Sequence, residues 1–163
     1  MCFLSFLKRL FDGRNRISKD ATIRKALQLL PDDIIDSLLE SSVEIRWHDL
    51  SFVQVSHIYA CRAKDTWGNN LMLLHTLWKK APVEQLACLI AHESCHKKEV
   101  ADLQEETTAT CKEAETWKEL RKDEMLYKST DLYERLEKLA RMSKSQITAY
   151  IKASNFYEKT LVV

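Results

Sequence analysis

Hydrophobic residues recur every three to four positions over much of the chain, which is the spacing of helices that bury one face. The first such stretch follows Asp20, and Pro31 interrupts it before a shorter one restarts at Asp32 or Asp33. Another follows Pro82, a residue suited to the first turn of a helix. The remaining helical stretches are residues 102–117, 120–127, 132–142 and 147–157.

Between the second and third of these stretches the pattern changes to one typical of strands. Residues 43–47 alternate apolar and polar side chains and are rich in β-branched and aromatic residues, and residues 52–55 form another short candidate. Two extended runs, 57–64 and 70–78, flank the segment 65–69, whose Asp, Gly and Asn favour a hairpin loop. The sequence therefore predicts an α+β fold, mostly helical, with a small antiparallel sheet packed on the helix after Pro82.

The length and composition of the chain are sufficient for one domain with a buried hydrophobic core. Its 163 residues are 45% hydrophobic and 30% charged, with only two Gly and two Pro, which is typical of a soluble, mostly helical protein. We expect one domain over residues 1–163, with an amphipathic segment at 1–19 and a helical extension at 118–163. The net charge of +1, with both signs interspersed, gives no footprint for a nucleic-acid partner.

The cysteines and the N-terminal segment bear on the compartment. Five cysteines are an odd number without the spacing of a disulfide framework, which favours a reducing, cytoplasmic compartment. They are Cys2, Cys61, Cys88, Cys95 and Cys111.

The apolar run at residues 1–11 is too short to span a bilayer, and its basic pair follows the apolar residues, so we expect neither a secretory signal nor stable membrane insertion. Packing of this segment on its own domain is favoured over contact with a membrane surface or a partner.

The segment His92-Glu93-Ser94-Cys95-His96 has the form H-E-x-x-H and lies inside the helical stretch after Pro82. Residues four apart share one face of a helix, so the imidazoles of His92 and His96 can point at one tetrahedral metal ion. Glu93 lies on the adjacent edge of that face, where it can take a proton from a metal-bound water. This arrangement indicates a zinc peptidase, and its alternative is two surface histidines beside a salt-bridging Glu.

A catalytic zinc needs a third protein ligand, and the acidic residues after His96 are the candidates. The segment Asp102-Leu103-Gln104-Glu105 has the form of a capping box, which would start a new helix after a break near residue 100. In an unbroken helix Glu106 would lie about 15 Å from His96, so ligation by Glu106 requires that break. Glu106 is the favoured third ligand, and the alternatives are Glu105, Asp102 and Glu99.

Together these residues resemble the gluzincin branch of the zincin metallopeptidases, in which H-E-x-x-H lies on one helix and a Glu ligand of the form E-x-x-A on the next. The matching residues are His92, Glu93 and His96, followed by Glu106-Thr107-Thr108-Ala109. The resemblance covers residues 58–117 and is strongest to small intracellular or phage-type metallopeptidases. It implies a minimal zincin-like fold, Zn2+ held by His92, His96 and Glu106, and hydrolysis of peptide bonds with Glu93 as the general base.

The resemblance also implies that a peptide or protein substrate lies along an edge strand, which we expect at residues 71–77. Such enzymes stabilise the oxyanion with a Tyr or His, and the candidates here are Tyr127, Tyr133, Tyr150, Tyr157 and His75. The alternative from another class is a non-catalytic zincin-like module that binds or regulates a partner through the helices of residues 120–157. Packing of those helices on their own domain is the favoured expectation.

Overall fold

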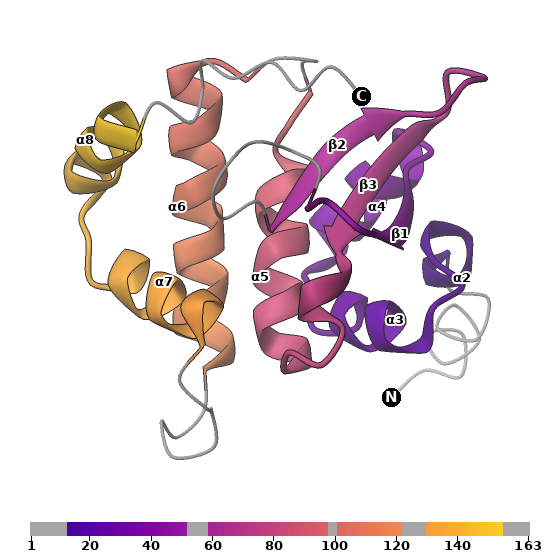
Figure 1. The fold of residues 1–163 in the computed structure, drawn as a ribbon, viewed down its shortest axis with the longest axis horizontal. Helices are drawn as coiled ribbons and strands as arrows, with labels where there is room; N and C mark the ends of the chain where they lie inside the picture. The colour runs from indigo at the N-terminus through magenta and orange to yellow at the C-terminus, as the bar shows by residue number, and fades with distance from the viewer. Residues whose placement is uncertain (1–12, 52–58, 98–100, 122–129, 155–163) are drawn as a thin grey trace.

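The computed structural model describes residues 13–51, 59–97, 101–121 and 130–154. Within these ranges it contains seven α-helices, one short 3-10 helix and a three-stranded mixed sheet (Figure 1). In chain order the elements are α2 (Arg14–Ile17), α3 (Ala21–Leu27), α4 (Asp32–Glu40), β1 (Glu44–His48), β2 (Ala60–Lys64), β3 (Asn70–His75), η1 (Thr76–Trp78), α5 (Val83–Ser94), α6 (Leu103–Leu120), α7 (Asp131–Ala140) and α8 (Lys144–Ser154). The expected α+β class with a helical majority is confirmed.

The helices begin where capping signals stand in the sequence. Asp20 caps α3, because its side chain accepts hydrogen bonds from the backbone N–H groups of Thr22 and Ile23 at 2.8 and 3.0 Å. Helix α4 restarts directly after Pro31, as expected. Pro82 is the N-cap residue of α5, one position before the first turn in which we expected it.

The expected hairpin is present, but the sheet is not purely antiparallel. Strands β2 and β3 pair antiparallel, from Ala60 with Leu74 to Lys64 with Asn70. Strand β1 pairs with β3 in parallel, so the prediction of an antiparallel sheet is wrong. A parallel partner is reached through a long connection, which leaves no local turn signal in the sequence.

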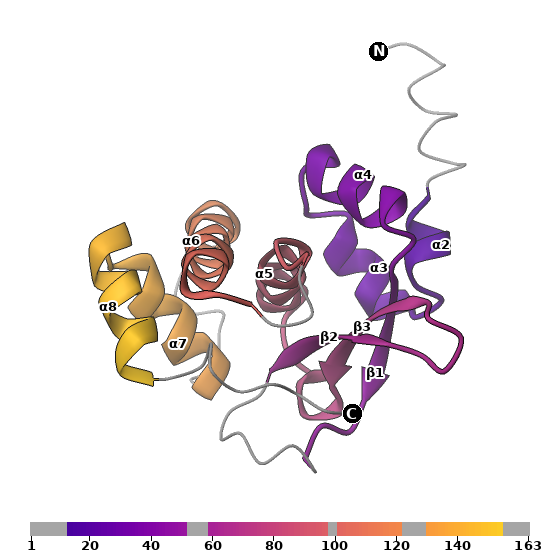
Figure 2. The same cartoon turned by 90° about the horizontal axis from the view of Figure 1, so that it is seen from above.

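The strand order β1-β3-β2 corrects a second expectation. Residues 71–77 do not form an edge strand, because β3 is the central strand and η1 follows it. Strand β2 is the edge nearest to α6 and α7, whereas β1 lies towards α2 (Figure 2). A peptide that adds a strand to this sheet would therefore pair with β2 or β1. The candidate strand at residues 52–55 lies outside the described residues.

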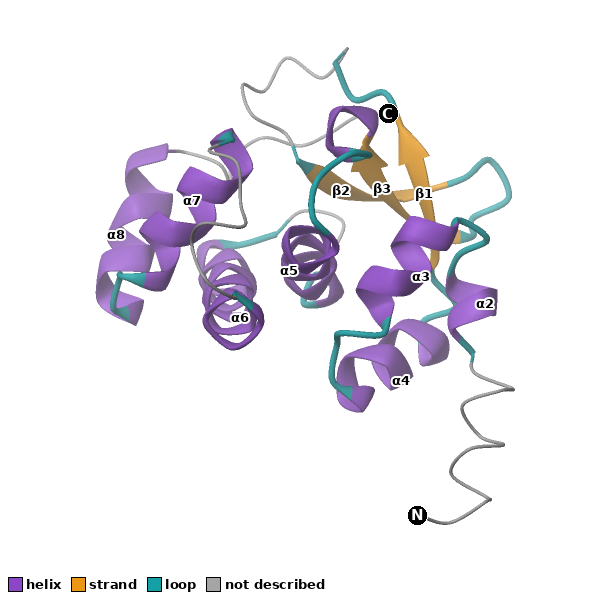
Figure 3. Cartoon of the chain, turned by 90° about the horizontal axis from the view of Figure 1, so that it is seen from below, coloured by secondary structure: helices purple, strands orange, loops and turns teal. Residues whose placement is uncertain are grey.

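Helix α5 lies between two parts of the molecule (Figures 2 and 3). One side packs against α3 and the sheet in an apolar core. Buried side chains of this core include Ile23, Leu27, Ile45, Met72, Leu74, Leu86 and Ile90. The other side faces α6, against which α7 and α8 pack in turn. The motif helix is therefore held on both sides, as a site of defined geometry requires.

The C-terminal helices bury their apolar faces against α6. Leu132 and Leu136 of α7 pack with Trp117, and Ile147 and Ile151 of α8 pack with Ala114. The apolar sides of α7 and α8 are thus used within the chain. The N-terminal segment 1–12 and the expected helix beyond residue 121 lie outside the described residues. Within the described ranges, no helix is long and apolar enough to cross a membrane.

Candidate metal centre

The chain breaks between the motif and the next helix, as a site containing Glu106 requires. Helix α5 ends at Ser94, and Cys95 is its C-cap residue, so His96 lies just past the end of the helix. Helix α6 begins at Leu103. Asp102 is its N-cap residue, and the side chain of Asp102 accepts a hydrogen bond from the backbone N–H of Glu105 at 2.9 Å. The break starts earlier than the expected position near residue 100. It lets α6 turn back and lie beside α5 (Figure 1).

Three donor atoms converge across this break. His92 Nε2 lies 3.7 Å from Glu106 Oε2, and His96 Nε2 lies 3.6 Å from Glu106 Oε1. The three residues offer one ligand atom each, all within 4.8 Å of one another. Zinc bonds of about 2.0–2.1 Å in a tetrahedron place ligand atoms about 3.4 Å apart, so this spacing fits one small cation. The group could hold a metal ion.

Glu113, two turns after Glu106 on α6, fixes the orientation of His92. Its Oε2 lies 3.0 Å from His92 Nδ1, so Nε2 of the same ring is left pointing towards Glu106. Carboxylates commonly hold metal-binding histidines in this way, because the hydrogen bond sets the tautomer and the angle of the ring. Glu113 in turn accepts hydrogen bonds from Arg135 of α7 at 3.0 and 2.8 Å.

The charges around Glu113 control its ionisation and that of His92. Burial alone would raise the pKa of Glu113, but Arg135 and His92 outweigh it and hold the pKa at about 2. Burial alone would lower the pKa of His92, but the hydrogen bond and charge of Glu113 raise it above its ordinary value. Glu113 is therefore a carboxylate at neutral pH, held between Arg135 and the Nδ1 atom of His92.

Glu93 and His96 have pKa values that burial dominates. Burial raises the pKa of Glu93 to about 7, although the charge of His92 acts in the opposite direction, and the side chain is 7% exposed. Burial, together with the charges of His92 and Arg62, lowers the pKa of His96 to about 3. The His96 imidazole is therefore neutral at neutral pH, which is the form that donates a lone pair to a metal.

The other acidic candidates for the third ligand have different surroundings. Asp102 caps α6. Glu105 Oε1 accepts a hydrogen bond from the backbone N–H of Lys97 and lies 3.8 Å from His96 Nδ1. Glu99 lies outside the described residues. Within the part of the chain that the structure describes, the group that could bind a metal contains Glu106.

The sequence analysis did not predict a role for two arginines that lie near the metal centre, Arg135 and Arg62. Arg135 stands in the apolar stripe of α7, three residues after Leu132 and next to Leu136. Arg62 stands opposite Met72 in the hairpin, on the side of the sheet that faces the core. Both are charges at positions that the hydrophobic pattern assigns to the interior, which is the signal that could have found them.

The candidates for an oxyanion donor are spread over the molecule. Tyr133 lies edge-on to Trp117 with ring centroids 6.0 Å apart, and the ring of Tyr150 lies under Lys138. His75 accepts a hydrogen bond from Leu77 at the start of η1. Tyr127 and Tyr157 lie outside the described residues. Tyr59, which is not among these candidates, also lies near the charged groups of the centre, because its ring is 5.2 Å from the Arg135 guanidinium.

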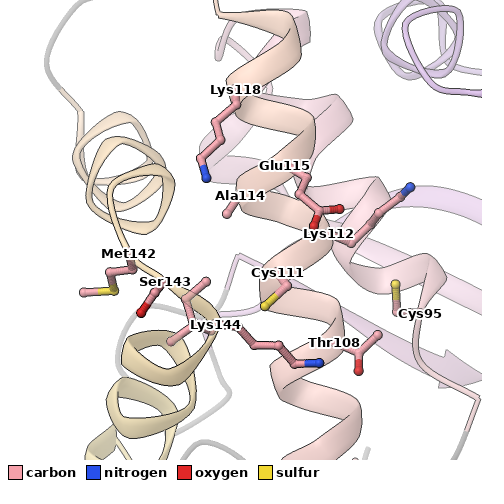
Figure 4. A pocket seen from close by; sticks show the side chains of 11 residues that line it. Cys95, Thr108, Cys111, Lys112, Ala114, Glu115, Lys118, Met142, Ser143 and Lys144 are labelled. Atoms are coloured by element: carbon pink, nitrogen blue, oxygen red, sulfur yellow. The ribbon is translucent and has the colours of Figure 1, made fainter.

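A hollow of about 440 Å³ lies between α6 and the start of α8, next to Cys95 (Figure 4). Three lysines line it, but Figure 4 shows the ammonium groups of Lys112, Lys118 and Lys144 pointing in different directions. The Cys95 thiol also lines this hollow and lies 3.5 Å from the carbonyl oxygen of Ala91, to which it donates a hydrogen bond. Cys95 is outside the group of three donors, because its neighbour in sequence, His96, is rotated by about 100° from it on a helical path.

Comparison of the chain with known proteins identifies no relative. No protein family model matches the chain, and neither a curated protein nor a solved structure matches it.

Proposed function

We propose that this protein is a zinc-dependent metallopeptidase. The observation that carries the proposal is the convergence of His92 of α5, His96 just past the end of α5 and Glu106 of α6, with the buried carboxyl group of Glu93 on the same helix as His92. Two imidazoles and one carboxylate are the ligand set of catalytic zinc sites in which a fourth position is left for water or substrate. The resemblance to gluzincins rests on the same residues.

Each residue of the centre has a task in this proposal. Bound at this centre, zinc would supply Lewis acidity, which polarises a carbonyl and makes water more acidic. His92, His96 and Glu106 hold the ion, and Glu113 keeps His92 in the tautomer that leaves Nε2 available. Glu93 acts as the general base, taking a proton from the attacking water and passing it to the leaving amine.

The substrate in this proposal is a peptide that pairs with β2 through backbone hydrogen bonds. Strand β2 is an edge of the described sheet and contacts α5, the helix that carries the motif. The other edge, β1, lies towards α2, away from α6 (Figure 2). Pairing with β2 would therefore bring the peptide to the edge of the sheet that is nearer to the three metal-binding residues.

The contacts of α7 and α8 do not favour the alternative of a non-catalytic module that binds partners through these helices. Their apolar faces are buried against α6, and α7 supplies Arg135 to the centre. These contacts favour a role of the C-terminal helices in supporting the metal centre.

Elemental analysis of the full-length, untagged protein tests the metal centre. Wild type and Glu105→Ala should contain about one zinc per chain, whereas His92→Ala and Glu106→Ala should lose it. Glu105→Ala tests the alternative ligand, because it removes the neighbouring carboxylate near His96 and leaves the three donors. Absence of zinc from the wild type after zinc has been supplied would contradict the proposal.

Peptide hydrolysis tests the enzymatic part. Glu93→Gln should keep its zinc and lose about 10²- to 10⁴-fold in kcat, because it removes the general base and no metal ligand. Undiminished hydrolysis by Glu93→Gln would exclude Glu93 as the base. Full zinc content without hydrolysis of any peptide by the wild type would favour the non-catalytic module.

A further inference from the structure

We propose that Arg62 is a substrate-recognition residue that binds a carboxylate of the peptide close to the scissile bond. The inference rests on the proposed peptidase function and names the substrate class of the same site. It is carried by the position of Arg62 on the edge strand, by its unused hydrogen-bond donors, and by its proximity to the motif.

Arg62 lies in the middle of β2, on the side of the sheet that α5 covers. It stands directly opposite Met72 in the antiparallel register, and residues paired in this way project from the same face of a sheet. Met72 is fully buried in the core, together with Leu86 and Ile90 of α5. A peptide strand added to β2 would continue this row of side chains beyond Arg62.

The guanidinium of Arg62 is half-buried, and it makes no hydrogen bond or ion pair with any residue that the structure describes. Other arginines of the chain differ in this respect. Arg46 on β1 binds the carboxylate of Glu44 through two nitrogens at 2.7 and 2.6 Å, and Arg135 binds Glu113 in the same two-pronged way. A guanidinium has five N–H donors in a rigid fork that matches a carboxylate. Arg62 therefore offers an unused, partly desolvated site for such a group.

Arg62 also lies beside the helix that carries the motif. It stands in the middle of β2, and β2 contacts α5. A peptide paired with β2 would therefore pass α5, and a carboxylate bound by Arg62 would belong to a residue near the reacting carbonyl.

A peptide carries such a carboxylate in one of two places. Binding of the C-terminal carboxylate would direct cleavage to the last residues of a substrate. Binding of an Asp or Glu side chain would direct cleavage to internal bonds beside acidic residues. The chemistry at Arg62 is the same in both cases, and matched peptides separate them.

The test uses the full-length, zinc-loaded protein and three peptides that differ only in their carboxylates. One has an internal Glu and an amidated C-terminus, the second has Gln in its place and the same amide, and the third has Gln and a free C-terminus. Wild type should show a kcat/KM about 10- to 100-fold higher on one of the two carboxylate peptides than on the neutral peptide. This preference should vanish in Arg62→Gln, return in part in Arg62→Lys, and persist in Arg46→Gln, the matched control on the other edge strand.

Each other outcome has a definite meaning when zinc content is measured in every variant. Equal rates on all three peptides, or a preference that survives in Arg62→Gln, would overturn the inference and leave the peptidase function standing. If the wild type hydrolyses none of the peptides, calorimetric binding of the same peptides decides the question. Tighter binding of a carboxylate peptide, lost in Arg62→Gln, would support Arg62 and contradict only the peptidase, whereas equal or absent binding would overturn the inference.

Discussion

The side of α5 that faces α3 and the sheet packs through apolar side chains, whereas the side that faces α6 and α7 combines the apolar Cys88 and Leu89 with His92, which is hydrogen-bonded to the buried Glu113. Apolar burial stabilises a fold in proportion to the area removed from water. Buried charges contribute little net stability, because their desolvation offsets their mutual attraction. The difference teaches that ionic groups and apolar packing share one side of α5 while the other side is apolar, so changes of the ionic groups and changes of the apolar core should alter different measurable quantities.

The largest effect is expected from breaking the Glu113–Arg135 pair. Arg135→Met leaves a buried carboxylate without its main partner and should lower the free energy of unfolding by about 3–5 kcal/mol. The double variant Glu113→Gln/Arg135→Met should recover most of that loss, because no unpaired charge remains. Its zinc affinity should nevertheless be about 10- to 100-fold weaker than in the wild type, because His92 loses its anionic partner.

Urea unfolding and competition with a zinc chelator measure the two quantities in the same variants. Recovery of zinc affinity together with stability in the double variant would show that Glu113 serves folding and not the metal centre.

The apolar side should respond in the opposite way. Leu27→Ala removes a fully buried side chain of α3 and should lower the free energy of unfolding by about 2–5 kcal/mol. Zinc affinity of the folded protein should be unchanged, as measured by chelator competition in the absence of urea. Leu77→Ala is the matched control, because Leu77 is 68% exposed and its truncation should cost less than about 0.5 kcal/mol. Weaker zinc binding in Leu27→Ala would mean that the two sides are coupled.

The smallest effect is expected at a second buried carboxylate, Glu137 of α7, which lies outside the metal centre. It accepts hydrogen bonds from Trp117 Nε1 at 2.8 Å and from Arg121 at 3.2 Å. Burial raises its pKa, but these partners outweigh it, so the net shift is downward from 4.5. A carboxyl group whose pKa is lower in the folded state stabilises the fold when the pH is above the pKa of the unfolded chain. This contribution is lost as the pH falls through the pKa of the folded state.

Glu137→Gln should therefore cost less than about 1 kcal/mol at neutral pH, because Arg121 and Arg141 are exposed to solvent. The cost should shrink as the pH falls below 4.5, and zinc affinity should not change. Urea unfolding across this pH range provides the measurement. A cost that grows in acid would show that the ionised form of Glu137 is not the one that stabilises the fold.

The sequence predicted those parts of the fold that local interactions decide. Asp20 and Pro31 mark helix boundaries through contacts within a few residues, and the turn at residues 65–69 sets the hairpin in the same way. The parallel pairing of β1 with β3 joins distant segments, and no local pattern records it. This pairing places β3 in the centre of the sheet, which is why the expected edge strand is wrong.

The same distinction between local and tertiary interactions applies to the candidate site. His92, Glu93 and His96 followed from helical spacing, although α5 ends at Ser94 and His96 lies past it, and Glu106 followed from the cap at Asp102, because both signals are local. The roles of Arg62 and Arg135 depend on how β2 and α7 pack against α5 and α6, which is decided by tertiary contacts.

The break between α5 and α6 also links the centre to the unfolding equilibrium of the whole chain. Its donors lie on α5, just past the end of α5 and on α6, so an ion that binds all three recognises the folded arrangement and not the extended chain. Such a ligand stabilises the folded state by RT ln(1 + [L]/Kd), which is about 2.7 kcal/mol at a hundredfold excess over Kd. Added zinc should therefore raise the Tm of the wild type and leave that of Glu106→Ala unchanged. Thermal melting thus becomes an assay of the centre that needs no knowledge of the substrate.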